Sequence, residues 1–276
     1  MTAIRDHAFD TPEPVRLLAR LGRGSLTATT EDTAAASVKV TGWHARDVVV
    51  DLVDGTLSVT VPQHRGFAER DIEVDVEVVL PTGSDLDVRT GTADLRAAGS
   101  YGAASLRSGS GALVVDTLTG AGLVETGSGD VHLARVGGEL QVKCGSGDVT
   151  VEHAAAAVVV STGSGDVRLG EVHGDLAVKT GSGDLRVARP LGDVTMTSGS
   201  GDVVVDRAAP TTITLRGAST DARVAIPVDL PVWTDVTSLS GSVRADTSPR
   251  GEPTDDRPHL TLRVSTVSGD VHLLDA

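Results

Sequence analysis

The sequence predicts an all-β fold: a single-domain β-solenoid with 18-residue coils, each made of two nonapeptide half-repeats. Three observations predict it: an exact repeat of period 18, apolar alternation of period two within each repeat, and a composition with 32 glycines but only five aromatic residues. Two short strands per repeat cannot bury their apolar sides alone, whereas stacked repeats form a continuous core. Such a narrow interior leaves little room for aromatic rings.

The regular repeats span residues 84–207. The string Gly-Ser-Gly-Asp recurs at intervals of 18, at 127–130, 145–148, 163–166, 181–184 and 199–202. After each Asp, apolar residues alternate with polar ones, so Arg168 and Arg186 are expected to point outward. A second alternation begins ten residues after the Asp and places Val160 and Val178 inside. Another turn signal, nine residues after the Asp, divides each coil into two nonapeptides.

The parallel β-helix is expected to be right-handed, because crossover connections between parallel strands almost always are. A stack of antiparallel hairpins with the same period is the alternative.

Less regular segments flank the repeats. Residues 1–83 keep the alternation with irregular spacing and indicate divergent N-terminal coils that also cap the stack. Residues 208–276 indicate degraded coils, with a loop at 246–258 rich in Pro, Asp and Gly. The strands at 260–274 are expected to close the stack, with no separate C-terminal cap. No linker is long enough to separate domains, so one domain is expected over residues 1–276.

Charge and composition exclude several classes of protein. The chain has 24 Lys plus Arg against 38 Asp plus Glu, a net charge of −14, which disfavours nucleic acid and anionic membranes as partners. No apolar run approaches membrane-spanning length, and residues 1–10 carry charges where a signal peptide would be apolar. We therefore expect a cytoplasmic protein without membrane insertion. Its charge opposes open-ended stacking, which favours a monomer or discrete homodimer over a filament.

The strongest chemical feature is an aspartate ladder: Asp130, Asp148, Asp166, Asp184 and Asp202. The structural interpretation is that each carboxylate closes its own turn by accepting backbone N–H groups, while nearby arginines reduce the repulsion. The alternative is a row of Ca²⁺ sites, since Ca²⁺ prefers oxygen ligands. Calcium-binding nonapeptides, however, do not place Asp directly after the last Gly. We therefore expect no metal and no cofactor.

Columns of hydroxyl residues accompany the ladder. Stacked Ser and Thr hydroxyls could satisfy one another inside a corner of the coil, where the single cysteine, Cys144, is expected to be a buried small residue. A serine nucleophile needs a neighbouring base, and no His recurs in a column that would supply one. The repeat glycines are expected to serve turns with positive φ and close approach of adjacent coils. No catalytic residue is predicted.

The opening Phe9-Asp10-Thr11-Pro12-Glu13-Pro14, the irregular strands after it and the tandem Thr-Gly-Ser-Gly-Asp-Val repeats resemble a known family. They are similar to bacterial β-strand-repeat proteins labelled "putative adhesin", or domain of unknown function 4097. The resemblance covers nearly the whole chain. It implies a β-helical fold, often found in proteins encoded near envelope-stress or membrane-associated systems, and no established catalytic residues.

Two functions follow from these observations. The first is a non-enzymatic scaffold or protein-interaction module, a rigid acidic β-helical rod with an unknown protein partner, linked to envelope or membrane-associated systems. The alternative is an enzyme or small-ligand-binding protein with a pocket where the repeat fails. The residues expected to form that pocket are Trp43, His44, His64, Phe67 and Trp233.

Overall fold

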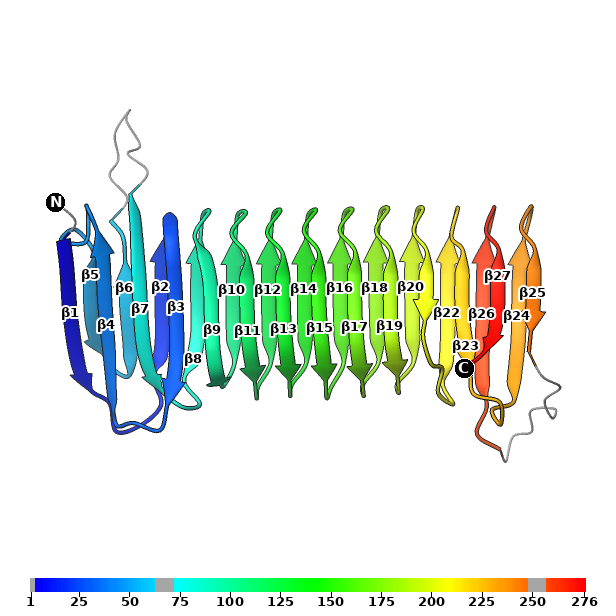
Figure 1. Cartoon of the computed structure of the whole chain (residues 1–276), viewed down its shortest axis with the longest axis horizontal. Helices are drawn as coiled ribbons and strands as arrows, with labels where there is room; N and C mark the ends of the chain where they lie inside the picture. Colours follow the sequence, from blue (N-terminus) through cyan, green and yellow to red (C-terminus); the bar gives the residue numbers. More distant parts are fainter. Residues whose placement is uncertain (1–2, 63–71, 248–256) are drawn as a thin grey trace. The chain divides into compact units, whose positions relative to one another are not determined.

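The computed structural model describes residues 3–62, 72–247 and 257–276, and all regular elements in these ranges are β-strands. Within these ranges no helix is long and apolar enough to cross a bilayer. The chain divides into two compact units, residues 1–138 and 139–276. Figure 1 labels the strands of both. The single domain expected from the sequence stays a prediction.

Unit 1, residues 1–138, contains two sheets. One has the strand order β1-β4-β7-β3-β9-β11-β13 and the other β12-β10-β8-β2-β6-β5. The strands are β1 (Ala3–Asp10), β2 (Arg16–Leu21), β3 (Arg23–Glu31), β4 (Ala35–Gly42), β5 (Val49–Val53), β6 (Thr56–Thr60), β7 (Glu73–Pro81), β8 (Asp85–Thr90), β9 (Asp94–Tyr101), β10 (Ala104–Ser108), β11 (Leu113–Leu118), β12 (Gly122–Thr126) and β13 (Val131–Val136).

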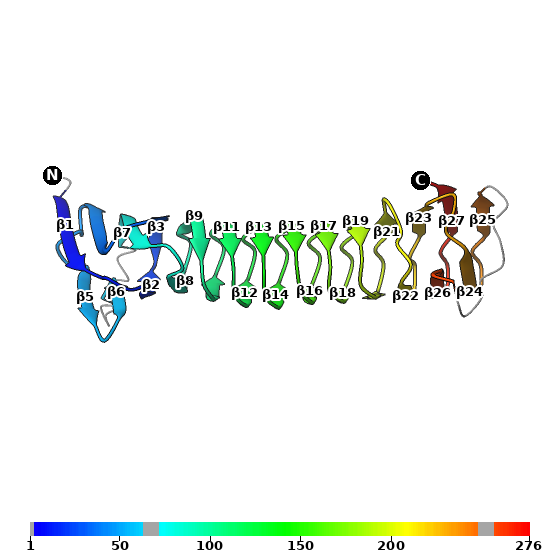
Figure 2. The same ribbon diagram turned by 90° about the horizontal axis from the view of Figure 1, so that it is seen from below.

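Unit 2, residues 139–276, also contains two sheets, which Figure 2 shows as two facing layers. Their strand orders are β15-β17-β19-β21-β23-β27-β25 and β24-β26-β22-β20-β18-β16-β14. The strands are β14 (Leu140–Cys144), β15 (Val149–Ala154), β16 (Val158–Thr162), β17 (Val167–Val172), β18 (Leu176–Thr180), β19 (Leu185–Pro190), β20 (Val194–Ser198), β21 (Val203–Val205), β22 (Thr212–Gly217), β23 (Ala222–Ile226), β24 (Val232–Ser238), β25 (Val243–Asp246), β26 (Leu260–Thr266) and β27 (Val271–Asp275).

Pairing among the regular strands is parallel, and partners are 18 residues apart. Val178 pairs with Val160 on one side and Met196 on the other, and all three side chains are buried. Arg168 pairs with Arg186 on the other sheet, and both are exposed. The predicted phase of the alternation is confirmed. The parallel registers also exclude the antiparallel-hairpin alternative for these strands, as expected of a β-helical, solenoid-like fold.

Among the described residues one aromatic side chain is fully buried, although the narrow interior was expected to leave little room for rings. Tyr101 ends β9 in unit 1 and has 0% exposure. The register between β9 and β11 shifts beside it, so that β9 carries an extra residue at this point. A β-bulge of this kind bends the strand locally and makes space for the ring. The Tyr101 hydroxyl donates to the Ala98 carbonyl at 3.2 Å.

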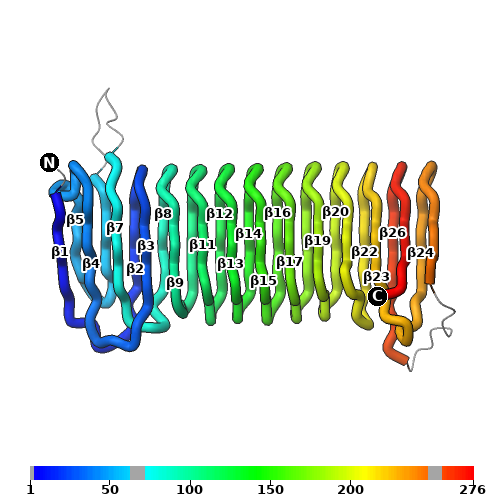
Figure 3. Tube along the Cα trace, viewed as in Figure 1, coloured from blue at the N-terminus to red at the C-terminus, as the bar shows by residue number. Residues whose placement is uncertain are grey.

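The strands at 260–274 do not close the stack, so that expectation is wrong. Strand β26 pairs with β22 on one side and β24 on the other, and β27 lies in the same way between β23 and β25 (Figure 3). The outermost coil of unit 2 is therefore the earlier pair, β24 and β25. Periodicity identifies a coil but carries no information about which coil it stacks on.

The repeat glycines have one of the two roles expected of them. None of those in the Gly-Ser-Gly-Asp turns is among the glycines with positive φ, so the left-handed explanation is wrong for the described turns. Close approach is confirmed, because a Cβ on Gly165 or Gly183 would lie 1.9 or 2.0 Å from the carbonyl oxygen of the glycine one coil before. Glycine is needed there for lack of space between coils.

Candidate functional site

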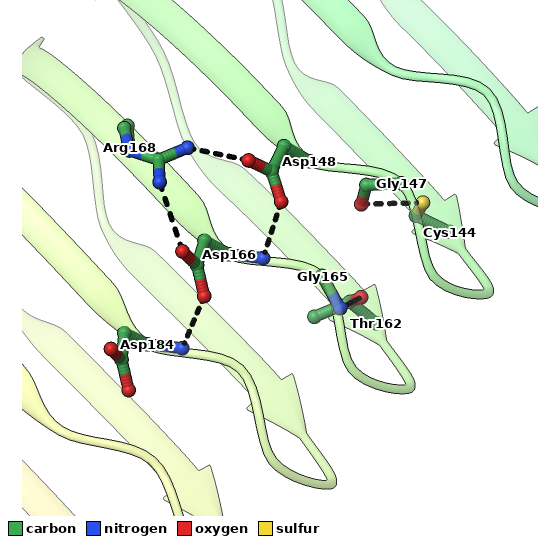
Figure 4. Close-up of polar contacts among 8 residues, drawn as sticks. All are labelled: Cys144, Gly147, Asp148, Thr162, Gly165, Asp166, Arg168 and Asp184. Atoms are coloured by element: carbon green, nitrogen blue, oxygen red, sulfur yellow. Dashed lines mark hydrogen bonds and ion pairs between the residues drawn. The ribbon is translucent and has the colours of Figure 1, made fainter.

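The aspartates of unit 2 form a continuous row along one edge of the stacked coils. In each case Oδ1 accepts the backbone N–H of the next aspartate in the row: Asp166 donates to Asp148 at 3.0 Å and Asp184 to Asp166 at 3.1 Å (Figure 4). Asp202 and Asp221 continue it at 2.9 and 3.2 Å. The carboxylates therefore bond coil to coil and do not close their own turns, which corrects the expected Asx turn.

The row extends beyond the exact repeats. Asp270 donates its N–H to Asp221 Oδ1 at 2.8 Å, and Ser242 donates its N–H to Asp270 Oδ1 at 2.7 Å. The bond from Ser242 lowers the pKa of Asp270 below its ordinary value. We call the six aspartates of this row in unit 2 the acidic edge: Asp148, Asp166, Asp184, Asp202, Asp221 and Asp270.

One arginine neutralises the start of the acidic edge. The Arg168 guanidinium donates to Asp148 Oδ2 at 2.7 Å and to Asp166 Oδ2 at 2.9 Å (Figure 4). These bonds lower the pKa of Asp148, an effect to which the N–H of Asp166 adds, and raise the pKa of Arg168. The expected softening of repulsion by Arg168 is thus present, whereas Arg186 bonds instead to Asp206 at 3.0 Å.

Further along, the acidic edge keeps exposed negative charge. Asp184, Asp202 and Asp221 are exposed, and within the described ranges their Oδ2 atoms have no hydrogen-bond or ion-pair partner. Each carboxylate is held through Oδ1 while Oδ2 faces solvent. The arrangement gives a fixed row of charges on a β framework.

Asp130 belongs to unit 1 and is exposed there, and its carbonyl accepts the N–H of Leu113 at 2.8 Å. In the described part of the chain, no group of three or more His, Cys, Asp or Glu is arranged to hold a metal ion.

The hydroxyl column bonds within its own turns. The hydroxyl of Thr162 accepts the N–H of Gly165 at 3.1 Å, and Thr180 accepts that of Gly183 at 2.8 Å. Cys144 is buried in the same column and directs its Sγ to the Gly147 carbonyl oxygen at 3.0 Å (Figure 4). In this column each side chain therefore closes its own turn, three residues later, and does not bond to the side chain of the next coil. Stacked hydroxyls do bond to one another in the serine column, where Ser219 Oγ lies 3.0 Å from Ser268 Oγ.

A second column of carboxylates was predicted only as a turn signal. Asp175 Oδ1 accepts the N–H of Asp193 at 3.1 Å, and Asp193 Oδ1 accepts the N–H of Thr212 at 2.8 Å. These bonds repeat the coil-to-coil pattern at the other turn of these two coils. The recurrence of Asp nine residues after the main aspartate was the signal that could have identified them.

The predicted pocket residues are only partly described. Trp43 lies in a turn of unit 1 and is 76% exposed, next to His44, whose Nδ1 is 3.1 Å from Asp47 Oδ2. Trp233 lies on β24 in unit 2, with the Arg263 guanidinium 5.7 Å from its ring centre. His64 and Phe67 lie outside the described residues. The pocket stays a prediction.

Known proteins are similar to this chain over most of its length. Residues 24–274 match the family model described as Toastrack DUF4097. No curated protein matches. A solved structure titled as a "putative adhesin" from Parabacteroides merdae shares 13% identity with a TM-score of 0.53, covering 98% of this chain and 96% of that one. At this identity the structural likeness shows a shared fold alone.

Two further solved structures are less similar. One is titled a "putative lipid binding protein" from Parabacteroides distasonis, with 14% identity, a TM-score of 0.43 and coverage of 98% of this chain and 96% of that one. The other is titled a "putative adhesin" from Bacteroides fragilis, with 11% identity, a TM-score of 0.37 and coverage of 99% and 97%.

Proposed function

Because the chain belongs to the Toastrack DUF4097 family, we propose that it is a non-enzymatic protein-interaction module, which binds its partner through the acidic edge. The observation that carries the proposal is the row of carboxylates held through Oδ1 with Oδ2 exposed. A rigid row loses little conformational freedom on binding, which favours affinity. The adhesin title of the Parabacteroides merdae neighbour agrees with a binding role.

The chemistry of the edge favours a protein partner with a basic surface. Carboxylates on successive coils are about 4.8 Å apart, so a strand or helix carrying Lys and Arg could meet several at once. The net charge of −14 steers such a partner toward the protein and repels anionic polymers. We keep a cytoplasmic location and a link to envelope or membrane-associated systems as parts of the same proposal. The right-handed coil of two nonapeptides also belongs to it.

The test separates charge from structure. In an Asp184→Asn/Asp202→Asn variant, each side chain keeps an oxygen that can accept the N–H from the next coil but loses its charge. We expect the melting temperature to stay close to that of the wild type. Proteins captured by the wild type from a lysate of the source organism, and identified by mass spectrometry, should be lost.

The matched control is Asp175→Asn/Asp193→Asn, which changes the net charge equally but alters the other carboxylate column. It should capture the same proteins as the wild type. Equal capture by all three proteins, or equal loss in both variants, would contradict binding through the acidic edge. Binding of a small molecule that is lost on Trp43→Ala or Trp233→Ala would favour the pocket instead.

A further inference from the structure

The outermost coil of unit 2 has two strands with free edges. Strand β24 pairs only with β26, and β25 only with β27, over residues 3–62, 72–247 and 257–276. The Ser242 and Pro231 carbonyls point inward, to Val271 and Leu260. Because backbone direction alternates along a strand, the N–H and C=O groups of Val243 and Ala245 point outward to the free edge.

Core-facing positions that are buried in the preceding coils are exposed in this outermost coil. Val243 aligns with Val271, which is buried, but is itself 54% exposed. On β24, Thr234 and Val236 align with the buried Leu262 and Val264, but Thr234 is exposed and Val236 is only half-buried. Among the described residues no element occupies the position that another coil would cover, so both backbone groups and the Val243 side chain are available for pairing. Edges of this kind favour addition of a further strand.

The edge strand of unit 1 is different. Strand β1 pairs with β4 in the antiparallel sense, and Arg5 lies in line with the buried Val40. The Arg5 guanidinium donates to the Arg46 and Val48 carbonyls at 3.2 and 3.0 Å. A charged side chain at a core-facing position discourages addition of another strand. Strand β25 has Val243 and Ala245 at the equivalent positions, and neither of these side chains is charged.

We propose that β24 and β25 pair with the same strands of a second copy of this chain, giving a closed two-fold dimer. Antiparallel pairing of a strand with its own copy is two-fold symmetric, and one axis perpendicular to the two sheets generates both pairs. Both free edges of the outermost coil are then used, so the assembly stops at two. The high negative charge also opposes further growth.

Charge complementarity favours a second copy of this chain as the partner of β25 and determines the register of the pairing. When the pairing of β25 is centred on Ala245, the two Ala245 residues exchange their outward N–H and C=O groups. Arg244 of each copy then lies opposite Asp246 of the other, so two opposite-charge pairs form. Centring on Arg244 would instead place two arginines directly opposite, which is unfavourable. The sequence Arg244-Ala245-Asp246 is thus complementary to itself in antiparallel pairing.

The first test is the mass in solution by analytical ultracentrifugation at physiological salt, across the micromolar range. The wild type should be a dimer of twice 28.2 kDa. Ala245→Pro removes an outward N–H and leaves the pairing with β27 intact, because the Ala245 backbone faces away from β27. This variant should be a monomer with an unchanged circular dichroism spectrum.

The second test exchanges the charges. Arg244→Asp or Asp246→Arg alone places like charges opposite each other and should weaken the dimer about tenfold or more. The double exchange restores opposite charges and should restore the dimer. A monomeric wild type, an open-ended polymer, or a dimer insensitive to Ala245→Pro and to both single exchanges would overturn the proposal. These readouts do not depend on the acidic edge or on any partner protein.

Discussion

Replacing Gly183 by alanine tests whether close stacking of coils explains the glycine of each repeat. The added Cβ would lie 2.0 Å from the Gly165 carbonyl oxygen, whereas real Cβ contacts are essentially never below 3.0 Å. Because the atoms that the Cβ would meet at Gly165 belong to the backbone and cannot rotate away, the two coils must separate locally by about 1 Å. The N–H of Ser182, 3.1 Å from the Gly163 oxygen, and that of Asp184, 3.1 Å from Asp166 Oδ1, would then leave hydrogen-bonding distance.

The expected loss follows from these contacts. The loss of these two hydrogen bonds at about 1 kcal/mol each, together with steric strain, reduces the free energy of unfolding by about 2–4 kcal/mol. The melting temperature should fall by roughly 5–15 °C, measured by differential scanning calorimetry. Gly22→Ala is the control, since its Cβ would meet no atom closer than 3.9 Å and its φ is not positive. Equal melting of Gly183→Ala and wild type would refute the stacking explanation.

Three further predictions concern the core, pH and metal. Val178→Asp, which buries an unpaired charge at a position 1% exposed, should lower the free energy of unfolding by several kcal/mol in a urea titration. Burial, with Asp116 adding to it, raises the pKa of Tyr101 above its ordinary 10.0. The contribution of protonated Tyr101 to the free energy of unfolding is therefore constant below pH 10 and is lost as the pH rises above 10, because the unfolded chain then ionises first. The absorbance of tyrosinate should accordingly appear only when the protein unfolds. Millimolar Ca²⁺ or a chelator should leave the melting temperature unchanged; a rise of many degrees with Ca²⁺ would contradict the structural role of the aspartates.

Much of the fold could be predicted because the same pattern of apolar and polar residues recurs in every regular coil. Each copy places Val160 or Val178 in the same phase, so one correct assignment holds for all regular coils. The bonding of the aspartates was harder to predict. A carboxylate after a glycine turn can accept an N–H from its own turn or from the next coil, and only the stacking geometry decides between them.

The features that could not be predicted occur where the repeat fails. The burial of Tyr101 depends on one extra residue in β9, which alternation alone does not reveal. The pocket residues come from segments without periodicity, so their sequence positions say little about which side chains meet. Trp43 and Trp233 could be recognised as unusual, but no pattern predicted the partner Arg263 of Trp233.

The position of β26 and β27 inside the outermost coil has a consequence for the order of folding. During synthesis, β24 and β25 emerge before β26 and β27, at a time when β22 and β23 still present the edges that β26 and β27 finally occupy. A provisional pairing of β24 with β22 is then available, and it must open before β26 can enter. Such an exchange is slow compared with adding a coil at the end. Refolding of unit 2 is therefore expected to show a slow phase, and this phase should be absent from a shortened chain that ends before β24.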